Sequence, residues 1–214
     1  MEGYPDQRQL ITRRATNITS VHHAVTDEMR ISRNGHRGGV LWFTGLSGAG
    51  KSTLAIELER RLFQKGYQVY VLDGDNLRDG LNANLGFSPE DRAENIRRAG
   101  QVAALMARAG FIVITAFISP YRSDRERARD AAGNDRFHEV FISADLDVCE
   151  ERDPKGLYSR ARSGEIPDFT GISAPYEAPE ACEIEIDTGG LDVPASLEKI
   201  LRYIEQHFPY SAGC

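Results

Sequence analysis

Residues 45–53 read GLSGAGKST, and this stretch decides the fold class of the chain. From Gly45 to Ser52 it fits G-x-x-x-x-G-K-[S/T], the pattern of a phosphate-binding loop. The loop follows an apolar run at 39–45, typical of a buried strand, and precedes a helical pattern at 51–66. Glycines let several backbone N–H groups turn toward phosphate oxygens, and a helix N-terminus favours negative charge. A chance glycine-rich turn is the alternative, but the flanking elements favour a nucleoside triphosphate site.

The loop predicts a role for each of its residues. Lys51 is placed to reach the β- and γ-phosphates, Ser52 to ligate Mg²⁺, and Thr53 to reach the α-phosphate. The backbone expected to cradle the phosphates comprises Gly45, Leu46, Ser47, Gly48, Ala49 and Gly50. Several enzyme classes share such a loop, so it does not identify the molecule that receives the phosphate.

The rest of the chain alternates apolar runs with amphipathic segments. Further strands are expected at 67–75, 111–119, 137–144 and 182–188, and helices at 88–110, near 121–132, in the Arg- and Lys-rich stretch from about 146 to 164, and around 197–208. Ser88 is a good N-cap for the helix at 88–110, and Asp91 is expected to cap back toward it. This alternation predicts an α/β fold with a five-stranded parallel sheet covered by helices on both faces.

Composition limits the classes of function. A net charge of −6 over 214 residues argues against a nonspecific nucleic-acid binder, and the apolar run at 111–118 is too short to span a membrane. The N-terminus lacks the pattern of a signal peptide. Three widely spaced cysteines are typical of reduced thiols in the cytoplasm, and the five histidines lack metal-ligand spacing. Residues 1–38 are polar and predict an arm with a short helix near 25–32, which leaves 39–214 as the main domain.

Residues near the expected strand ends suggest where a phosphate acceptor binds. DGDNLR at 73–78 places Asp73 and Asp75 at the carboxyl end of the second strand, where ligands bind in open parallel sheets. One carboxylate could order the waters of a magnesium ion and the other accept a proton from an attacking hydroxyl; a polar turn is the alternative. Arg92 and Asn95 share a helix face, and with Arg78 they are candidates to hold an anionic acceptor.

Three other stretches remain ambiguous from their residues alone. Phe87 fits a hydrophobic staple on the following helix, which its spacing favours, or a ring that stacks on a base together with Phe169. Ser119 fits a nucleophile that carries a transient phosphate or, more simply, a contact to the substrate. The residues Arg152, Lys155, Arg160 and Arg162 fit a lid that closes over a triphosphate or a solvated charged helix.

Other nucleotide-binding classes lack support. The chain has no Asn-Lys-x-Asp for reading guanine, and its length leaves little room for the sensor elements of a motor ATPase. A small-molecule kinase needs only a donor loop, an acceptor pocket and a lid. The pattern therefore favours a kinase, with a nucleotide-sensing regulatory module as an alternative from another class.

Five blocks of the chain, in this order, resemble the adenylylsulfate kinase (APS kinase) family of P-loop kinases. They read GLSGAGKST, DGDNLRDGLNANLGFSPEDRAENIRR, FISPYRSDR, CEERDPKGLY and DFTGISAPYEAP, and the resemblance extends from about Ala15 to the end. It implies a P-loop kinase fold with a mobile lid at approximately 150–178. It also implies transfer of phosphate from ATP, with Mg²⁺, to the 3′-hydroxyl of adenosine 5′-phosphosulfate (APS), which gives ADP and 3′-phosphoadenylyl sulfate (PAPS). Another small-molecule P-loop kinase, or a relic that senses PAPS, is the alternative.

The resemblance also implies which residues act. Asp75 would be the base, with Asp73 and Lys51 at the catalytic centre, and Arg152 and Thr188 would lie near the ATP base. The implied APS-binding residues are Asp75, Arg78, Phe87, Arg92, Asn95, Ile118, Ser119, Lys155 and Phe169. The residue equivalent to Ser119 is traditionally described as a phosphoserine intermediate, but positioning and charge neutralisation suffice for direct transfer. A cytoplasmic homodimer with a functional link to ATP sulfurylase is expected.

The chain departs from the family pattern at a few positions. Ser123 and Ser159 stand where a basic residue is expected, which would weaken lid closure or ATP affinity without removing the chemistry. The arm continues SVHH after ATNIT, where relatives tend to carry Trp-His, so an arm contact across a dimer is in doubt.

Overall fold

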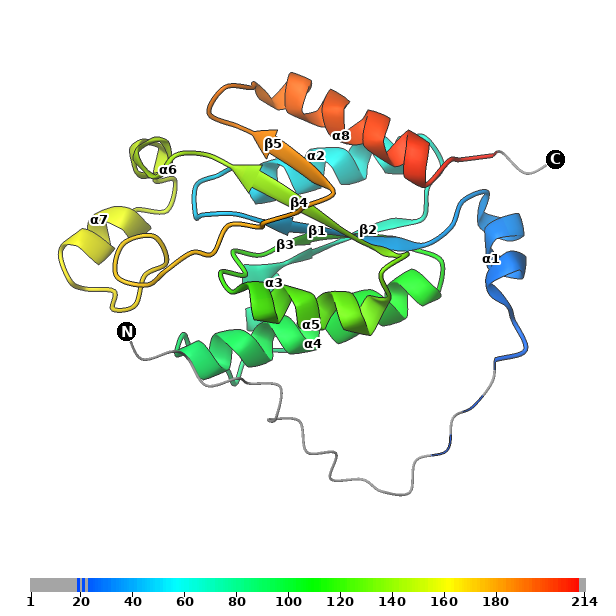
Figure 1. Ribbon diagram of the computed structural model, residues 1–214, viewed down its shortest axis with the longest axis horizontal. Helices are drawn as coiled ribbons and strands as arrows, with labels where there is room; N and C mark the ends of the chain where they lie inside the picture. Colours follow the sequence, from blue (N-terminus) through cyan, green and yellow to red (C-terminus); the bar gives the residue numbers. More distant parts are fainter. Residues whose placement is uncertain (1–18, 20, 22, 212–214) are drawn as a thin grey trace.

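A single sheet of five parallel strands forms the centre of the molecule (Figure 1), as the sequence predicts. The computed structural model describes residues 19, 21 and 23–211. The strand order is β2-β3-β1-β4-β5. The strands are β1 (Gly39–Thr44), β2 (Val69–Asp73), β3 (Ile112–Ala116), β4 (Phe137–Ser143) and β5 (Ile184–Asp187). Because β1 lies between two strands on each side, the phosphate-binding loop that follows it emerges at the middle of the sheet.

Helices cover both faces of the sheet (Figure 1). On one face α2 (Lys51–Gln64) and α8 (Val193–His207) bury leucine and isoleucine side chains against the strands. On the other face α4 (Pro89–Arg108) and α5 (Arg122–Ala132) pack mostly through alanines. A Cβ atom on Gly100 would lie 2.9 Å from Cβ of Ala128, so these two helices cross closely. Small residues therefore let α4 and α5 pack closely, and α4 carries the predicted acceptor residues Arg92 and Asn95.

Two local predictions need correction at the acceptor side. The second strand was expected over 67–75 but ends at Asp73, which caps a short helix, α3 (Gly74–Asp79), by accepting a hydrogen bond from the Asp75 amide at 3.0 Å. Ser88 caps α4 as expected, but the carboxylate of Asp91 accepts from the Gly86 amide at 2.8 Å rather than reaching back to Ser88. Both carboxylates thus organise the chain that joins β2 to α4.

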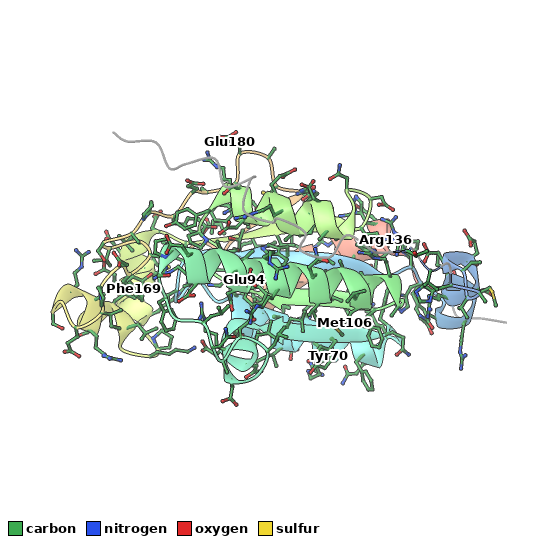
Figure 2. All side chains as sticks on the ribbon, turned by 90° about the horizontal axis from the view of Figure 1, so that it is seen from below. Tyr70, Glu94, Met106, Arg136, Phe169 and Glu180 are labelled. Atoms are coloured by element: carbon green, nitrogen blue, oxygen red, sulfur yellow. The ribbon has the colours of Figure 1, made fainter. Side chains whose placement is uncertain are left out.

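The ends of the sheet differ in what covers them. Helix α1 (Asp27–Asn34) lies at the end where the strands begin, where Asn34 donates to the Gly110 carbonyl. At the other end lie α6 (Leu146–Arg152), α7 (Leu157–Arg162) and the loop that carries Phe169 (Figure 2). The predicted arm at 1–38 is described only at 19, 21 and 23–38, so its first 18 residues lie outside the described part. In the described part of the chain, no helix has the length and apolar character needed to span a membrane.

Candidate active site

The phosphate-binding loop turns tightly where β1 gives way to α2. Gly48 and Gly50 adopt φ values of 77° and 94°, in the left-handed region that side chains disfavour. A Cβ on Gly48 would also lie 2.8 Å from the carbonyl oxygen of Cys149, in α6. Helix α2 begins at Lys51 with Gly50 as its N-cap, so its first N–H groups face the loop. The loop and the first turn of α2 thus have the geometry of an anion-binding backbone.

Lys51 lies under this loop with 8% of its surface exposed. Its Nζ donates to the carbonyl oxygens of Gly45, at 3.0 Å, and Leu46, at 2.7 Å. Burial lowers the pKa of Lys51 to about 8, against the opposing effect of nearby Cys149 and of the carboxylates of Asp73 and Asp75. The ammonium is therefore mostly charged at neutral pH and is held where a phosphate chain would lie.

Ser52 and Asp73 join the donor loop to the end of β2. The Ser52 hydroxyl donates to Oδ2 of Asp73 at 2.7 Å, and Oδ1 of Asp73 caps α3. Asp73 is thus held by both of its oxygens, while the carboxylate of Asp75 projects from the first turn of α3. Residues that are more than 20 positions apart in the sequence therefore form one cluster of oxygen atoms.

Asp75 forms an ion pair with Lys155, which lies between α6 and α7. Both side chains are well exposed, at 71% for Asp75 and 59% for Lys155, so solvent screens the pair. The hydrogen bond that Lys155 donates to the Asp75 carboxylate raises the pKa of Lys155. The structure thus places the predicted lid cation directly on the predicted base.

The predicted acceptor residues Arg78 and Phe87 contact each other. The Arg78 guanidinium lies 4.4 Å from the centre of the Phe87 ring and donates to the carbonyls of Leu85 and Gly86. Burial lowers the pKa of Arg78, and the nearby Arg92 adds to this effect. Phe87 is 67% exposed, so it does not act as a buried hydrophobic staple. Its open ring is the geometry that stacking on a base requires.

Arg92 ties two separate loops together. Its Nε donates to the Phe87 carbonyl at 2.8 Å, and its two terminal nitrogens donate to the Thr170 hydroxyl, at 2.7 Å, and to the Asp168 carbonyl. The two loop phenylalanines predicted to form one pair therefore lie in segments that one guanidinium connects. Arg92 consequently has a structural task as well as its predicted role at the acceptor.

Phe169 differs from Phe87 in burial. It is 7% exposed and meets the Tyr158 ring edge to face, with centroids 5.0 Å apart. The Tyr158 hydroxyl donates to the Ser47 carbonyl in the phosphate-binding loop at 2.9 Å. Tyr158 thus connects the donor loop to the second phenylalanine, a connection that sequence reasoning missed. Its only signal was a large aromatic within the arginine-containing segment GLYSRAR.

Ser119 is held at a strained turn after β3. Its φ is 39°, its exposed fraction is 2%, and its hydroxyl accepts a hydrogen bond from the Trp42 indole at 3.2 Å. Arg125 donates to the Ser119 carbonyl at 2.8 Å, and Thr44 donates to the Ile118 carbonyl at 2.8 Å. Sequence reasoning missed Arg125, whose buried pairing with Glu139 of β4 could not be read from spacing.

Asn95 lies on α4 with 5% of its surface exposed. Its Oδ1 accepts a hydrogen bond from Nδ2 of Asn82 at 2.9 Å. Asn82 is fully buried in the loop that joins α3 to α4, and it too was missed. An asparagine in a stretch rich in Asn and Gly is typical of a turn, so the sequence provided no sign that it reaches a site residue.

Arg152 and Thr188, both predicted to lie near the ATP base, contact each other beside the donor loop. Arg152 donates to the hydroxyl of Thr188 at 3.2 Å and also to its carbonyl, and reaches the Gly48 carbonyl at 3.4 Å. The Thr188 hydroxyl in turn donates to the Ala49 carbonyl at 2.9 Å. The remaining candidate cations of the lid, Arg160 and Arg162, pair with Glu165 and Glu150, as exposed charges on a helix do.

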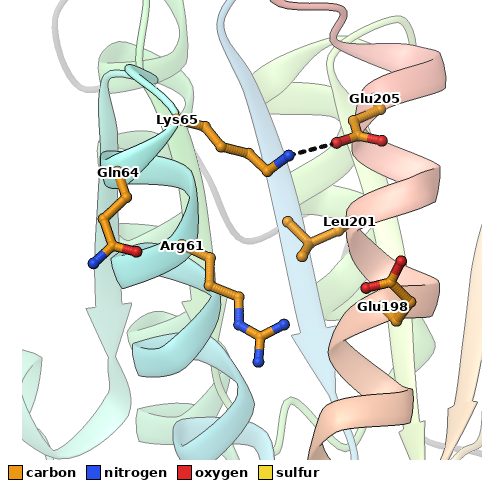
Figure 3. A pocket seen from close by; sticks show the side chains of 6 residues that line it. All are labelled: Arg61, Gln64, Lys65, Glu198, Leu201 and Glu205. Carbon is orange, nitrogen blue, oxygen red and sulfur yellow. Dashed lines mark hydrogen bonds and ion pairs between the residues drawn. The ribbon is translucent and has the colours of Figure 1, made fainter.

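A shallow hollow between α2 and α8 lies away from this edge of the sheet (Figure 3). It measures about 330 Å³ and is lined by Arg61, Gln64, Lys65, Glu198, Leu201 and Glu205. Lys65 and Glu205 form an exposed ion pair across it at 2.8 Å. Its other charges also have partners, since Arg61 pairs with Glu57 and Glu198 with Arg202, so the site described above remains the candidate active site.

Known proteins share both the sequence and the fold of the chain. Residues 37–187 match the family model described as adenylylsulphate kinase. The chain is 56% identical to an adenylyl-sulfate kinase of Staphylococcus epidermidis, over 90% of the chain and 97% of that protein. It is 54% identical to a probable adenylyl-sulfate kinase of Bacillus subtilis, over 89% of the chain and 98% of that protein. A Mycobacterium tuberculosis APS kinase solved in complex with AMPPNP and APS superposes with a TM-score of 0.76, at 48% identity, over 79% of the chain and 98% of that structure.

Proposed function

We propose a residue-level mechanism for this chain, which belongs to the adenylylsulfate kinase family and is an ATP-dependent phosphotransferase. The reaction moves the γ-phosphate of ATP to the 3′-hydroxyl of APS and yields PAPS and ADP, a step of sulfate assimilation. The observation that carries the mechanism is the contact of Ser52 with Asp73, because it brings the donor loop and the carboxylates after β2 into one cluster.

On the donor side, the backbone of residues 45–50 and the first turn of α2 bind the phosphates of ATP. Lys51 leaves the carbonyls of Gly45 and Leu46 to contact the transferring phosphate, and Thr53 contacts the α-phosphate. Arg152 and Thr188 line the place of the ATP base, where they already contact the loop through Gly48 and Ala49. Neutralising the phosphate charge is the main catalytic task in such a transfer.

Ser52 and Asp73 fit a magnesium ion. Hydroxyl and carboxylate oxygens are the hard ligands that Mg²⁺ prefers, and these two lie 2.7 Å apart. Within the described residues no group of three or more His, Cys, Asp or Glu side chains could hold a metal. This suits Mg²⁺, which commonly keeps several waters and binds through one or two protein ligands together with substrate phosphates. Ser52 would ligate the ion and Asp73 would hold its waters, and the bound ion would neutralise charge on the phosphate oxygens.

On the acceptor side, Asp75 accepts the proton of the 3′-hydroxyl as that oxygen attacks the γ-phosphate. Its carboxylate is exposed and adjoins Asp73, so an acceptor can approach it. Phe87 and Phe169 clamp the adenine of APS between them, and Arg78 neutralises the anionic part of APS. The other acceptor contacts come from Arg92, Asn95, Ile118 and Lys155, and Ser119 supports the site from the turn after β3.

Transfer is direct, without a phosphoserine. Ser119 is nearly inaccessible, and its hydroxyl is already engaged by the Trp42 indole. A nucleophile needs an exposed oxygen and a nearby base, and neither Trp42 nor Arg125, which contacts the Ser119 carbonyl, can act as one. Ser119 instead supports the acceptor site by shaping the turn after β3.

Residues 150–178 act as a lid over the active site. The chain divides after residue 38 into an N-terminal arm and the kinase domain, which comprises residues 39–214. Lys155 pairs with Asp75 before the acceptor binds and exchanges this partner for the acceptor on closure. In α7, the backbone N–H of Ser159 donates to the carboxylate of Asp153, which follows α6. This contact holds Ser159 in place without using its side chain. A serine rather than a basic residue there reduces the charge that closes on ATP.

The chain acts as a homodimer in the cytoplasm. Exposed apolar side chains support the dimer, since Tyr70 on the edge strand β2 and Leu105 on α4 are 51% and 65% exposed. Sedimentation equilibrium tests this proposal, which a monomer at all concentrations would contradict. A functional link to ATP sulfurylase remains a prediction from the family.

The activity is tested by measuring ADP release from the purified protein with ATP, Mg²⁺ and APS. We expect APS-dependent release of ADP together with formation of PAPS. Adenosine 5′-monophosphate, which lacks the sulfate, is the control and should support far less turnover. ADP release with a different hydroxyl compound, but not with APS, would contradict the assignment.

A further inference from the structure

Asn82 is a fully buried polar residue that the mechanism above does not use. It lies between α3 and α4, where its backbone N–H donates to the Leu77 carbonyl at 2.7 Å and its carbonyl accepts from the Leu85 amide at 3.0 Å. Its side-chain Nδ2 donates to Oδ1 of Asn95, while its Oδ1 has no hydrogen-bond partner among the described residues. A buried polar atom without a partner is costly, so its presence calls for an explanation.

The hydrogen bond determines which atom of Asn95 is free to bind another group. An asparagine amide has one acceptor and one donor end, and Oδ1 of Asn95 is occupied by Asn82. The other end, Nδ2, donates to no acceptor among the described residues. It is not one of the fully buried side-chain atoms that lack a partner, so it is accessible to solvent. Asn95 therefore presents an N–H donor to open space beside the acceptor site.

This donor agrees with the neighbouring chemistry. Arg78 and Arg92 are permanently charged donors without acceptor atoms, and both lie in the segments that flank Phe87. A ligand held by these groups must supply lone pairs, as the ring nitrogens and the phosphate and sulfate oxygens of APS do. An Asn95 amide turned the other way would place an acceptor oxygen toward those lone pairs and would repel them.

We propose that Asn82 is a positioning residue that fixes the amide of Asn95 with its N–H toward APS. The inference rests on the proposed binding of APS at Asn95. Asn82 acts only through Asn95, because it is fully buried itself. Burying Oδ1 of Asn82 without a partner lowers the stability of the fold. The same arrangement orients Asn95 for a specific contact with APS.

The variant Asn82→Asp tests the direction of the hydrogen bond. The ionised carboxylate that this variant places at position 82 can only accept, so Asn95 would turn its N–H inward and its oxygen toward APS. We expect the KM for APS to rise about tenfold, the size of one lost hydrogen bond, with the KM for ATP and kcat within about twofold of the unaltered protein. A KM for APS that stays unchanged up to the highest pH at which the enzyme is active, where the carboxyl is ionised, would overturn the proposal.

The same variant provides a pH signature that a general loss of packing would not produce. Burial raises the pKa of a carboxyl group, and the neutral acid can donate its O–H to Asn95. The KM for APS of Asn82→Asp should therefore approach the normal value at low pH and rise with pH. The matched control is Asn84→Asp, which adds the same charge to an exposed position of the same loop, where Asn84 accepts from Arg98. An equal defect and pH profile in both variants would assign the effect to charge and contradict the proposal.

A double-mutant cycle decides the question even if Asn82→Asp folds poorly. Asn82→Ala, Asn95→Ala and the double variant are compared by the KM for APS, with thermal unfolding measured for each. If Asn82 acts through Asn95, the double variant binds APS no worse than Asn95→Ala alone; additive losses would overturn the proposal. A normal KM for APS in Asn95→Ala would refute the proposed contact itself, whereas absence of turnover in the unaltered protein would refute the proposed function.

Discussion

The two halves of the site are built in different ways. The phosphate-binding part of the donor half is one continuous segment, residues 45–53. Its contacts are made largely by backbone atoms, such as the carbonyls of Ser47 and Ala49 that accept from Tyr158 and Thr188. The acceptor half is assembled from separate loops, which side chains such as Arg92 and Asn82 join to α4 and to one another. Backbone contacts tolerate substitution of side chains, whereas contacts between side chains do not. We therefore expect the donor half to depend on few side chains and the acceptor half to depend on many.

The largest effect is expected at the one donor side chain that the backbone cannot replace. Lys51→Ala should lower kcat by about a thousandfold, because the charge that neutralises the transferring phosphate is lost. Steady-state ADP release measures the change, with Lys65→Ala as the control, since Lys65 forms only an exposed ion pair with Glu205. Near-normal turnover of Lys51→Ala would mean that the backbone alone performs the donor half of the reaction.

The next effect separates chemistry from binding. Asp75→Asn should lower kcat by about a hundredfold, because the amide cannot accept the proton, while the KM for ATP stays within about threefold. Asp79→Asn, at the far end of α3, is the control for the loss of a negative charge. A parallel loss of ATP binding would assign Asp75 to the donor half instead.

The two phenylalanines provide a contrast within the acceptor half. Phe87→Ala should raise the KM for APS about 30-fold, the size of one lost stacking contact, and leave the melting temperature unchanged, since the ring is exposed. Phe169→Ala should weaken APS binding and also destabilise the fold by about 3 kcal/mol, because the ring is buried against Tyr158. Thermal unfolding of Phe87→Ala at a lower temperature would instead support its role as a hydrophobic staple.

The pH dependence of kcat/KM for ATP is expected to follow the protonation of Lys51. Because burial lowers the pKa of Lys51 to about 8, its charge is present below this pH and is lost as the pH rises. kcat/KM for ATP should fall by at most about tenfold between pH 7 and pH 9, as expected for one titrating group. kcat at saturating ATP should fall less, because bound phosphate favours the charged amine. A rise in kcat/KM over this range would contradict the role of the ammonium.

The smallest effect is expected at Ser119. Ser119→Ala removes a hydrogen bond from the Trp42 indole and should cost about 1 kcal/mol of stability, with kcat within about threefold of normal. Incubation with labelled ATP and detection of phosphoprotein provides an independent measurement, in which we expect no label on the unaltered protein. A loss of activity of a thousandfold, or a labelled serine, would establish a covalent intermediate.

The regular parts of the fold could be predicted because their signals are local. The five parallel strands, the layers of helices and the Ser88 cap follow from periodicity and capping residues. Local signals were insufficient to predict which backbone group a carboxylate would bind. Asp73 was expected to end a strand, but it also caps α3, and Asp91 binds Gly86 rather than Ser88.

The predicted site residues divide in the same way. The structure brings Arg152 to Thr188 and Lys155 to Asp75, but the order of residues in the chain does not reveal these pairs. It also shows that Phe87 is open and Phe169 enclosed, although both are phenylalanines in loops. Burial depends on what packs above a residue, and a one-dimensional pattern does not contain that information.

By itself, the sequence determined that this chain binds a triphosphate and places carboxylates at the next strand end, because GLSGAGKST and DGD carry their chemistry within a few consecutive residues. Only the tertiary structure decided that Ser52 contacts Asp73, that Tyr158 supports the donor loop and that Asn82 orients Asn95. The physical reason is that a hydrogen bond depends on distance and direction in space, and these arise only when the sheet and its two helical layers have packed together.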